Sequence, residues 1–148
     1  MKTILTETAG QTRKLGVKIG ESIKGGEVIL LFGPLGSGKT TFAGGLVTYL
    51  SGIKRVLSPT YNIVRQYNPK NNNSLLSHIF HLDLYRIDSP SQVLNLGIWD
   101  LLGQKNILIV IEWPEIIIDL LPKRRIDIKF KTIDDGKREI KIEDYQIK

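Results

Sequence analysis

The sequence predicts an α/β fold in which a central, mostly parallel sheet is flanked by helices and extended by antiparallel hairpins. The chain has 148 residues, 41% of them hydrophobic, which suits a single domain over residues 1–148 with a sizeable core. Residues 27–32 and 107–111 are short apolar runs, typical of strands buried on both faces of a parallel sheet. Residues 33–40 are rich in glycine and precede a stretch with helical periodicity, so strand, loop and helix follow one another.

The N-terminal third is expected to alternate strands and helices. Residues 2–6 suit a short strand, and Thr8 or Thr6 can cap a helix that glycines 25–26 end. This helix and the one after the glycine-rich stretch each carry apolar side chains at helical spacing, and Gly52 ends the second. These side chains are Leu15, Ile19, Ile23, Phe42, Leu46, Val47 and Leu50.

Two hairpins and one short helix are expected in the rest of the chain. Residues 55–57 are a candidate strand, and residues 61–82 suit a β-hairpin with a polar loop at its tip. A helix is expected over residues 88–96, where a serine that can cap it precedes a proline. Residues 126–133 and 139–147 alternate between apolar and polar around an Asp-Asp-Gly-Lys turn, which predicts a final hairpin.

Composition excludes several kinds of site. The chain has no cysteine, so a disulfide framework, a cysteine nucleophile and a thiolate metal site are excluded. His78 and His81 are three residues apart on an expected strand, which sends them to opposite faces, so a pair of histidine metal ligands is not expected. Residues 1–10 show no signal-peptide core, and no apolar run approaches the roughly 18 residues of a membrane helix. We therefore expect a cytoplasmic protein with no membrane contact.

The charge is unevenly distributed along the chain, which has a formal net charge of +6. Residues 1–70 hold 10 basic and 3 acidic side chains, residues 71–122 hold 2 and 6, and residues 123–148 hold 9 and 6. A basic protein with an acidic middle suits contact with a polyanion such as RNA on one surface and a bound cation elsewhere. A solvated basic surface without a partner explains the same numbers equally well.

Residues 33–40 read Gly-Pro-Leu-Gly-Ser-Gly-Lys-Thr and match the phosphate-binding pattern G-x-x-x-x-G-K-[ST]. The glycines allow backbone N–H groups to surround a phosphate, Lys39 can neutralise the β- and γ-phosphates, and the Thr40 hydroxyl can bind Mg²⁺. ATP is favoured as the nucleotide because the chain has no N-K-x-D-type guanine signature. The residues expected at the nucleotide are Pro34, Leu35, Gly36, Ser37, Gly38, Lys39, Thr40 and Thr41. A glycine-rich turn that merely includes a lysine is the alternative.

Two acidic residues end expected strands and complete a hypothesis for the chemistry. Glu112 follows the apolar run at 107–111, and Asp83 ends a strand in the same way. Ligands bind at the carboxyl ends of the strands in open α/β sheets. We assign Glu112 to Mg²⁺ beside Thr40, and Asp83 to orienting or deprotonating the attacking water, with an exchange of these two roles left open. Lys39 and Asp83 are thus the expected catalytic residues.

Three further features have two interpretations each. Residues 58–61 read Ser-Pro-Thr-Tyr and form either a simple strand break or a switch segment that senses the γ-phosphate. Trp113 suits packing in the core or a lid better than stacking on a base. The basic residues 123–125 suit a solvated end of an element or contacts to phosphate groups.

Residues 33–40, which we call the P-loop, and three other segments resemble those of the TsaE family, small bacterial P-loop ATPases of tRNA threonylcarbamoyladenosine biosynthesis. The three segments are residues 58–61, His-Leu-Asp-Leu-Tyr-Arg at 81–86, and Ile-Glu-Trp-Pro-Glu at 111–115. The resemblance runs over nearly the whole chain. It implies a Mg²⁺-dependent ATPase that works with the partners TsaB and TsaD, reaches tRNA only through them, and resets their assembly between turnovers.

The resemblance also implies roles for individual residues. It assigns the phosphates to Lys39, magnesium to Thr40 and Glu112, hydrolysis to Asp83, and a switch-like loop to residues 58–61. It further places Thr6 near the nucleotide and Arg138 near the phosphates. The chain departs from the family at Pro34, where aspartate is usual, and at Ser37, where alanine is common.

Two rival functions remain on the sequence alone. A small-molecule or nucleotide kinase could use the same P-loop, but kinases usually carry an arginine-rich lid, and the seven arginines of this chain are scattered. A non-enzymatic switch that binds a nucleotide and reports it to a partner is the other rival.

Overall fold

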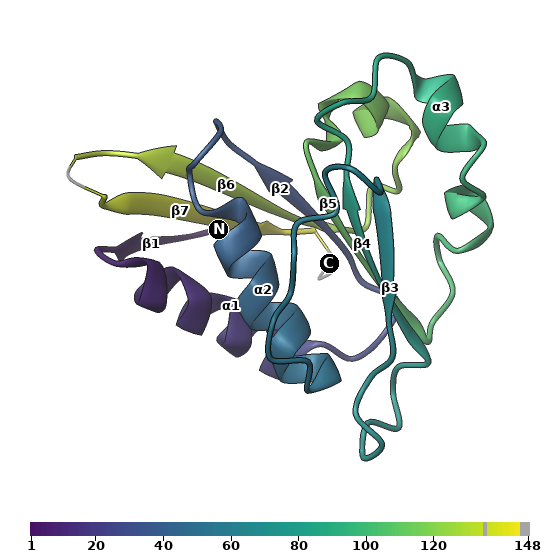
Figure 1. The fold of residues 1–148 in the computed structure, drawn as a ribbon, viewed down its shortest axis with the longest axis horizontal. Coiled ribbons are helices and arrows are strands. Elements are labelled where there is room, and N and C mark those ends of the chain that lie inside the picture. Colours follow the sequence, from purple (N-terminus) through teal and green to yellow (C-terminus); the bar gives the residue numbers. More distant parts are fainter. Residues whose placement is uncertain (135, 146–148) are drawn as a thin grey trace.

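The protein forms one α/β domain built on a seven-stranded mixed sheet (Figure 1). This computed structural model describes residues 1–134 and 136–145. The strand order is β1-β7-β6-β2-β5-β4-β3; the pairs from β6 to β4 are parallel, and the outer pairs are antiparallel. The expected fold class, a parallel centre with antiparallel additions, is therefore confirmed. The elements are β1 (Lys2–Thr6), α1 (Ala9–Ser22), β2 (Val28–Phe32), α2 (Lys39–Ser51), β3 (Val64–Tyr67), β4 (His78–Asp83), α3 (Pro90–Leu94), η1 (Ile98–Asp100), β5 (Ile107–Glu112), η2 (Pro114–Leu120), β6 (Ile126–Thr132) and β7 (Arg138–Asp144), where η marks a 3-10 helix.

Different elements cover the two faces of the sheet. Helices α1 and α2 pack on the face that carries Leu31 of β2 and Val110 of β5, whereas α3, η1 and η2 cover the face of Leu30 and Ile111 (Figure 1). Strand β5 is buried at every position, as its apolar composition predicts. Because side chains alternate along a strand, the acid that ends β5 lies on the same face as Val110 and therefore beside α2.

Most expected elements are present, and the exceptions have physical reasons. Thr8 caps α1 by accepting a hydrogen bond from the N–H of Gln11, and both expected hairpins form, as β3–β4 and β6–β7. Residues 55–57 do not form a strand, which corrects our expectation, because β3 already occupies the sheet edge beside β4. Helix α3 ends at Leu94, before the expected residue 96. Ile147, the end of the last expected strand, lies outside the described residues.

In the part of the chain that the structure describes, no helix is both long and apolar enough to cross a membrane. The longest helix, α1, has 14 residues. A membrane span needs about 20 predominantly apolar residues.

Helices α1 and α2 touch through their backbones, and this contact sets the position of the P-loop. A Cβ atom added at Gly16 of α1 would lie 2.1 Å from the carbonyl oxygen of Phe42, and one at Gly45 of α2 would lie 2.1 Å from that of Arg13. Helix α2 begins at Lys39, the last residue but one of the P-loop. Close packing against α1 therefore holds the start of α2 in place.

We predict that Gly16→Ala and Gly45→Ala each destabilise the protein, because the added methyl group overlaps a backbone carbonyl that cannot move freely. Overpacking of this kind costs about 1–3 kcal/mol. Urea unfolding measures the loss. Gly10→Ala is the matched control, since its Cβ would meet only the Thr8 hydroxyl at 3.7 Å and alanine favours a helix. Equal midpoints for all three variants would contradict the close packing.

Candidate functional site

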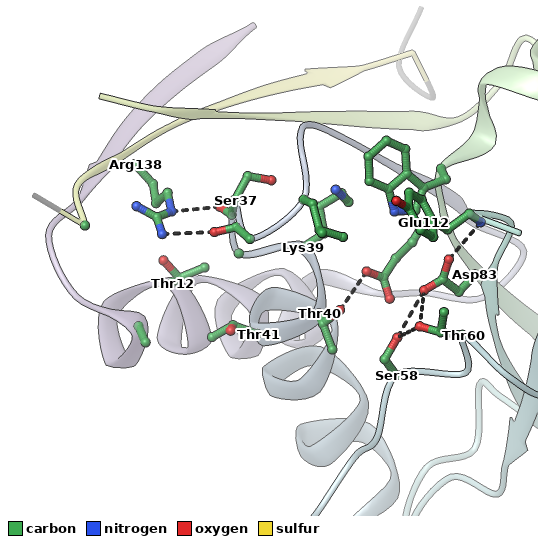
Figure 2. Close-up of a pocket in the computed structure, with 17 residues that line it drawn as sticks. Thr12, Ser37, Lys39, Thr40, Thr41, Ser58, Thr60, Asp83, Glu112 and Arg138 are labelled. Carbon is green, nitrogen blue, oxygen red and sulfur yellow. Dashed lines mark hydrogen bonds between the residues drawn. The ribbon is translucent and has the colours of Figure 1, made fainter. Parts of the chain in front are cut away.

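A cavity of about 310 Å³ opens between the P-loop, the start of α1 and the carboxyl ends of β4 and β5 (Figure 2). Its lining includes Leu35 to Thr41 of the P-loop and helix α2, and both acids singled out in the sequence, Asp83 and Glu112. The structure therefore brings the P-loop and the two acids to one place. This place is the carboxyl edge of the parallel strands, where α/β sheets bind ligands.

Glycines give the P-loop its path. Gly33, Gly36 and Gly38 have φ values of 148°, 74° and 103°, which lie in the region that other residues rarely adopt. Gly38 is the N-cap of α2 and provides no side-chain cap. The first N–H groups of α2 belong to residues that line the cavity, and no helix satisfies such groups internally. This helix end can therefore bind an anion.

Lys39 is held close to the loop by backbone carbonyl groups. Its Nζ donates to the carbonyl oxygens of Gly33 at 2.5 Å and Pro34 at 3.0 Å, and lies 3.9 Å from the centre of the Trp113 ring. Burial lowers the pKa of the Lys39 amine, and the nearby carboxylates, of which Glu112 contributes most, oppose that shift. Trp113 also packs against the Tyr85 ring, so these contacts favour packing over stacking on a base as the interpretation of Trp113.

Each carboxylate oxygen of Glu112 has a polar partner. The Thr40 hydroxyl donates to Oε1 over 2.8 Å, and Nε2 of His81 lies 2.7 Å from Oε2. Among the described residues no three acidic or histidine side chains form a metal-binding group. A hydroxyl and one carboxylate nevertheless fit Mg²⁺, which keeps several waters and takes its other ligands from substrate phosphates.

Asp83 anchors the segment at 58–61. Its Oδ2 accepts hydrogen bonds from the hydroxyls of Ser58 at 3.0 Å and Thr60 at 2.8 Å, and its Oδ1 accepts one from the N–H of Tyr85. Figure 2 shows both hydroxyls next to this carboxylate and pointing at it. The segment is therefore more than a strand break, because it touches one of the two acids directly.

Of the two remaining residues expected near the nucleotide, Arg138 lines the cavity and Thr6 does not. Arg138 donates from Nε to the carbonyl oxygen of Ser37 and from a terminal nitrogen to that of Gly36, both at 3.0 Å, and lines the cavity. Thr6 is buried and shares a 2.8 Å hydrogen bond with the hydroxyl of Thr12, which lines the cavity in its place. Pro34 also lies outside the lining and contributes its carbonyl oxygen to Lys39.

The sequence reasoning missed His81 as part of the site. The spacing of three residues places His78 and His81 on opposite faces of a strand. A comparison with Asp83, two residues further along the same strand, would have placed both on one face, because side chains on a strand alternate. Thr12 carried no comparable signal, since its role depends on how α1 packs beside the P-loop.

Comparison with known proteins identifies the family of the chain. A family model described as "Threonylcarbamoyl adenosine biosynthesis protein TsaE" matches residues 6–140. The chain belongs to the TsaE family. The family is involved in tRNA threonylcarbamoyladenosine biosynthesis, and its recognition from the segments at 58–61, 81–86 and 111–115 is thereby confirmed.

Individual members of the TsaE family cover most of the chain. The TsaE protein of Rickettsia conorii is 36% identical over 129 residues, which span 86% of this chain and 70% of that protein. The TsaE protein of Borreliella burgdorferi is 38% identical over 113 residues, or 76% of this chain and 78% of that protein. A crystal structure of Bacillus subtilis YdiB superposes with a TM-score of 0.77 at 28% identity, covering 97% of this chain and 85% of that chain.

We predict that Arg138→Met weakens ADP binding about tenfold, because two hydrogen bonds that hold the P-loop carbonyls are lost. Arg138→Lys should weaken ADP binding nearly as much, since a lysine keeps the charge but does not bridge two carbonyl groups. Calorimetric titration with ADP measures the effect. Lys137→Met is the control, because this substitution removes an equal charge from a side chain whose Nζ lies 4.0 Å from Oε1 of Glu7. Wild-type affinity in Arg138→Met would show that the loop holds its shape alone.

Proposed function

We propose that this protein is a Mg²⁺-dependent ATPase that works in the cytoplasm with TsaB and TsaD and resets their assembly between turnovers. The observation that carries the proposal is the arrangement of Thr40, Glu112 and Asp83 beside the P-loop. Glu112 shares a hydrogen bond with Thr40, and Asp83 lies opposite Glu112 in the pairing of β4 with β5. A P-loop alone only binds a nucleotide; hydrolysis also needs a metal ligand and a group that orients water.

In this proposal the chain's own residues divide the work as follows. Lys39 leaves the carbonyl groups of Gly33 and Pro34 and binds the β- and γ-phosphates, together with the first N–H groups of α2. Thr40 and Glu112 hold Mg²⁺, which when bound neutralises charge on the phosphates. Asp83 accepts a hydrogen bond from the attacking water and orients it toward the γ-phosphate.

The pathway of the family supports the choice of partners. The relatives are named for tRNA threonylcarbamoyladenosine biosynthesis, whereas the residues that line the cavity suit the hydrolysis of ATP. An ATPase needs other proteins to modify RNA, and we propose TsaB and TsaD as these partners. The protein then reaches tRNA indirectly, so the basic surface of the chain needs no RNA contact of its own.

An ATPase assay of the purified protein, first alone and then with TsaB, TsaD and tRNA, tests the proposal. We expect Mg²⁺-dependent release of phosphate that the full assembly stimulates strongly. Transfer of the γ-phosphate to a metabolite would replace the proposal with the kinase. Tight ATP binding without turnover in any mixture would replace it with a nucleotide switch.

We predict that Asp83→Asn binds ATP with an affinity close to that of the wild type but hydrolyses it about 100-fold more slowly or worse, because a positioned general base contributes at least that factor. Equilibrium binding of ATP and phosphate release under single-turnover conditions separate the two effects. Asp88→Asn is the control, since Asp88 is an exposed acid outside the cavity. Undiminished turnover in Asp83→Asn would move the water-orienting role to Glu112.

A further inference from the structure

We propose that His81 is a positioning residue that fixes the Glu112 carboxylate for Mg²⁺. The inference rests on the proposed function and assigns to it a residue that does not touch the nucleotide cavity. His81 is fully buried, with 0% of its surface exposed, and is absent from the lining of the cavity. Its Nε2 lies 2.7 Å from Oε2 of Glu112, so any effect on the site passes through that carboxylate.

The contact with His81 completes the support of Glu112. The carboxylate is itself 1% exposed, and its other oxygen, Oε1, accepts the hydrogen bond of Thr40. An ionised carboxylate only accepts hydrogen bonds, so Nε2 of His81 carries the hydrogen and donates it. Two donors from different elements, α2 and β4, fix the plane of the carboxylate. Without His81, Oε2 would be a buried acceptor with no donor, and the group could rotate.

The imidazole ring does not suit a purely structural role. Its Nδ1 has no hydrogen-bond partner among the described residues. A buried polar atom without a partner destabilises the folded protein, so an apolar side chain would fill the same space at lower cost. His78, on the opposite face of the same strand, differs: it is half-buried, and its Nδ1 lies 3.1 Å from the Ser77 hydroxyl, away from both acids. The bond to Glu112 is therefore the reason for a histidine at position 81.

The expected effect is on the metal and not on the nucleotide. Removing a group that orients a metal ligand typically lowers metal affinity about 10–100-fold. The phosphates are bound by Lys39 and the start of α2 in the proposed function, whereas the side-chain hydrogen bond that the structure describes for His81 goes to Glu112. Loss of His81 should therefore weaken the response to Mg²⁺ while ADP binding without metal stays the same.

The test compares His81→Ala, His81→Gln and the control His78→Ala by calorimetric titration of ADP, in EDTA and across a range of Mg²⁺ concentrations. For His81→Ala we expect ADP affinity in EDTA within about twofold of the wild type, and a half-saturating Mg²⁺ concentration at least about tenfold higher. The amide of His81→Gln can donate from nearly the same place and should recover most of the Mg²⁺ response. His78→Ala should match the wild type throughout.

A second comparison keeps the inference testable if His81→Ala fails to fold. His81→Leu fills the space without a donor, so a raised Mg²⁺ requirement in His81→Leu but not in His81→Gln supports positioning, with melting temperatures recorded for both. In a Glu112→Ala background, His81→Leu should change the Mg²⁺ response no further, because residues that act as a unit are not additive.

Three outcomes overturn the inference. Wild-type Mg²⁺ dependence in a folded His81→Leu or His81→Ala variant shows that the histidine only packs. A His81→Gln variant as poor as His81→Leu shows that the donor is not what matters. A wild-type protein that binds ADP without any response to Mg²⁺ overturns the proposed function itself, and the inference with it. This outcome is seen in the wild type alone, whereas the other two outcomes are seen only in the variants.

Discussion

The parallel pairing of β4 with β5 is the constraint on which the candidate site depends. It sets Asp83 directly opposite Glu112 at the carboxyl end of both strands. A shift of one residue in either strand would turn that acid to the opposite face, against α3 and the 3-10 helices. The register is held by burial on both sides, because Ile79 and Leu108 pack into one core cluster and Leu82 and Ile111 into the other.

Two neighbouring buried acids need many donors. Asp83 and Glu112 are 4% and 1% exposed, and burying a carboxylate is costly unless hydrogen bonds or opposite charge compensate for lost water. Asp83 receives three hydrogen bonds and Glu112 has two polar partners, one of them His81. The donors come from the segment at 58–60, from α2, from β4 and from the N–H of Tyr85, just after β4. The hydrogen bonds to the two acids thus connect parts of the chain that are far apart in sequence.

Sequence patterns predicted the parts of this site that depend on local rules. The P-loop follows from glycine and lysine spacing, and both acids follow from apolar runs that end in a charge. The residues that depend on packing were harder. Residues 55–57 are a candidate strand in the sequence, yet β3 occupies the sheet edge beside β4 and residues 55–57 form no strand. His81 could have been found by comparing its position with that of Asp83 on the same strand. Arg138 lies on β7, and only the resemblance of the chain to the TsaE family placed it near the P-loop.

The two cations at the P-loop differ in what a nucleotide would require of them. Lys39 binds the carbonyl groups of Gly33 and Pro34 and has to leave them to reach a phosphate. Arg138 binds the carbonyls of Gly36 and Ser37 from outside the loop, and those bonds need not break. The loop is therefore held in shape by Arg138 before any nucleotide arrives, which lowers the entropy that binding costs. Pro34 fits this arrangement because only its carbonyl is used, and its fixed φ stiffens the same turn.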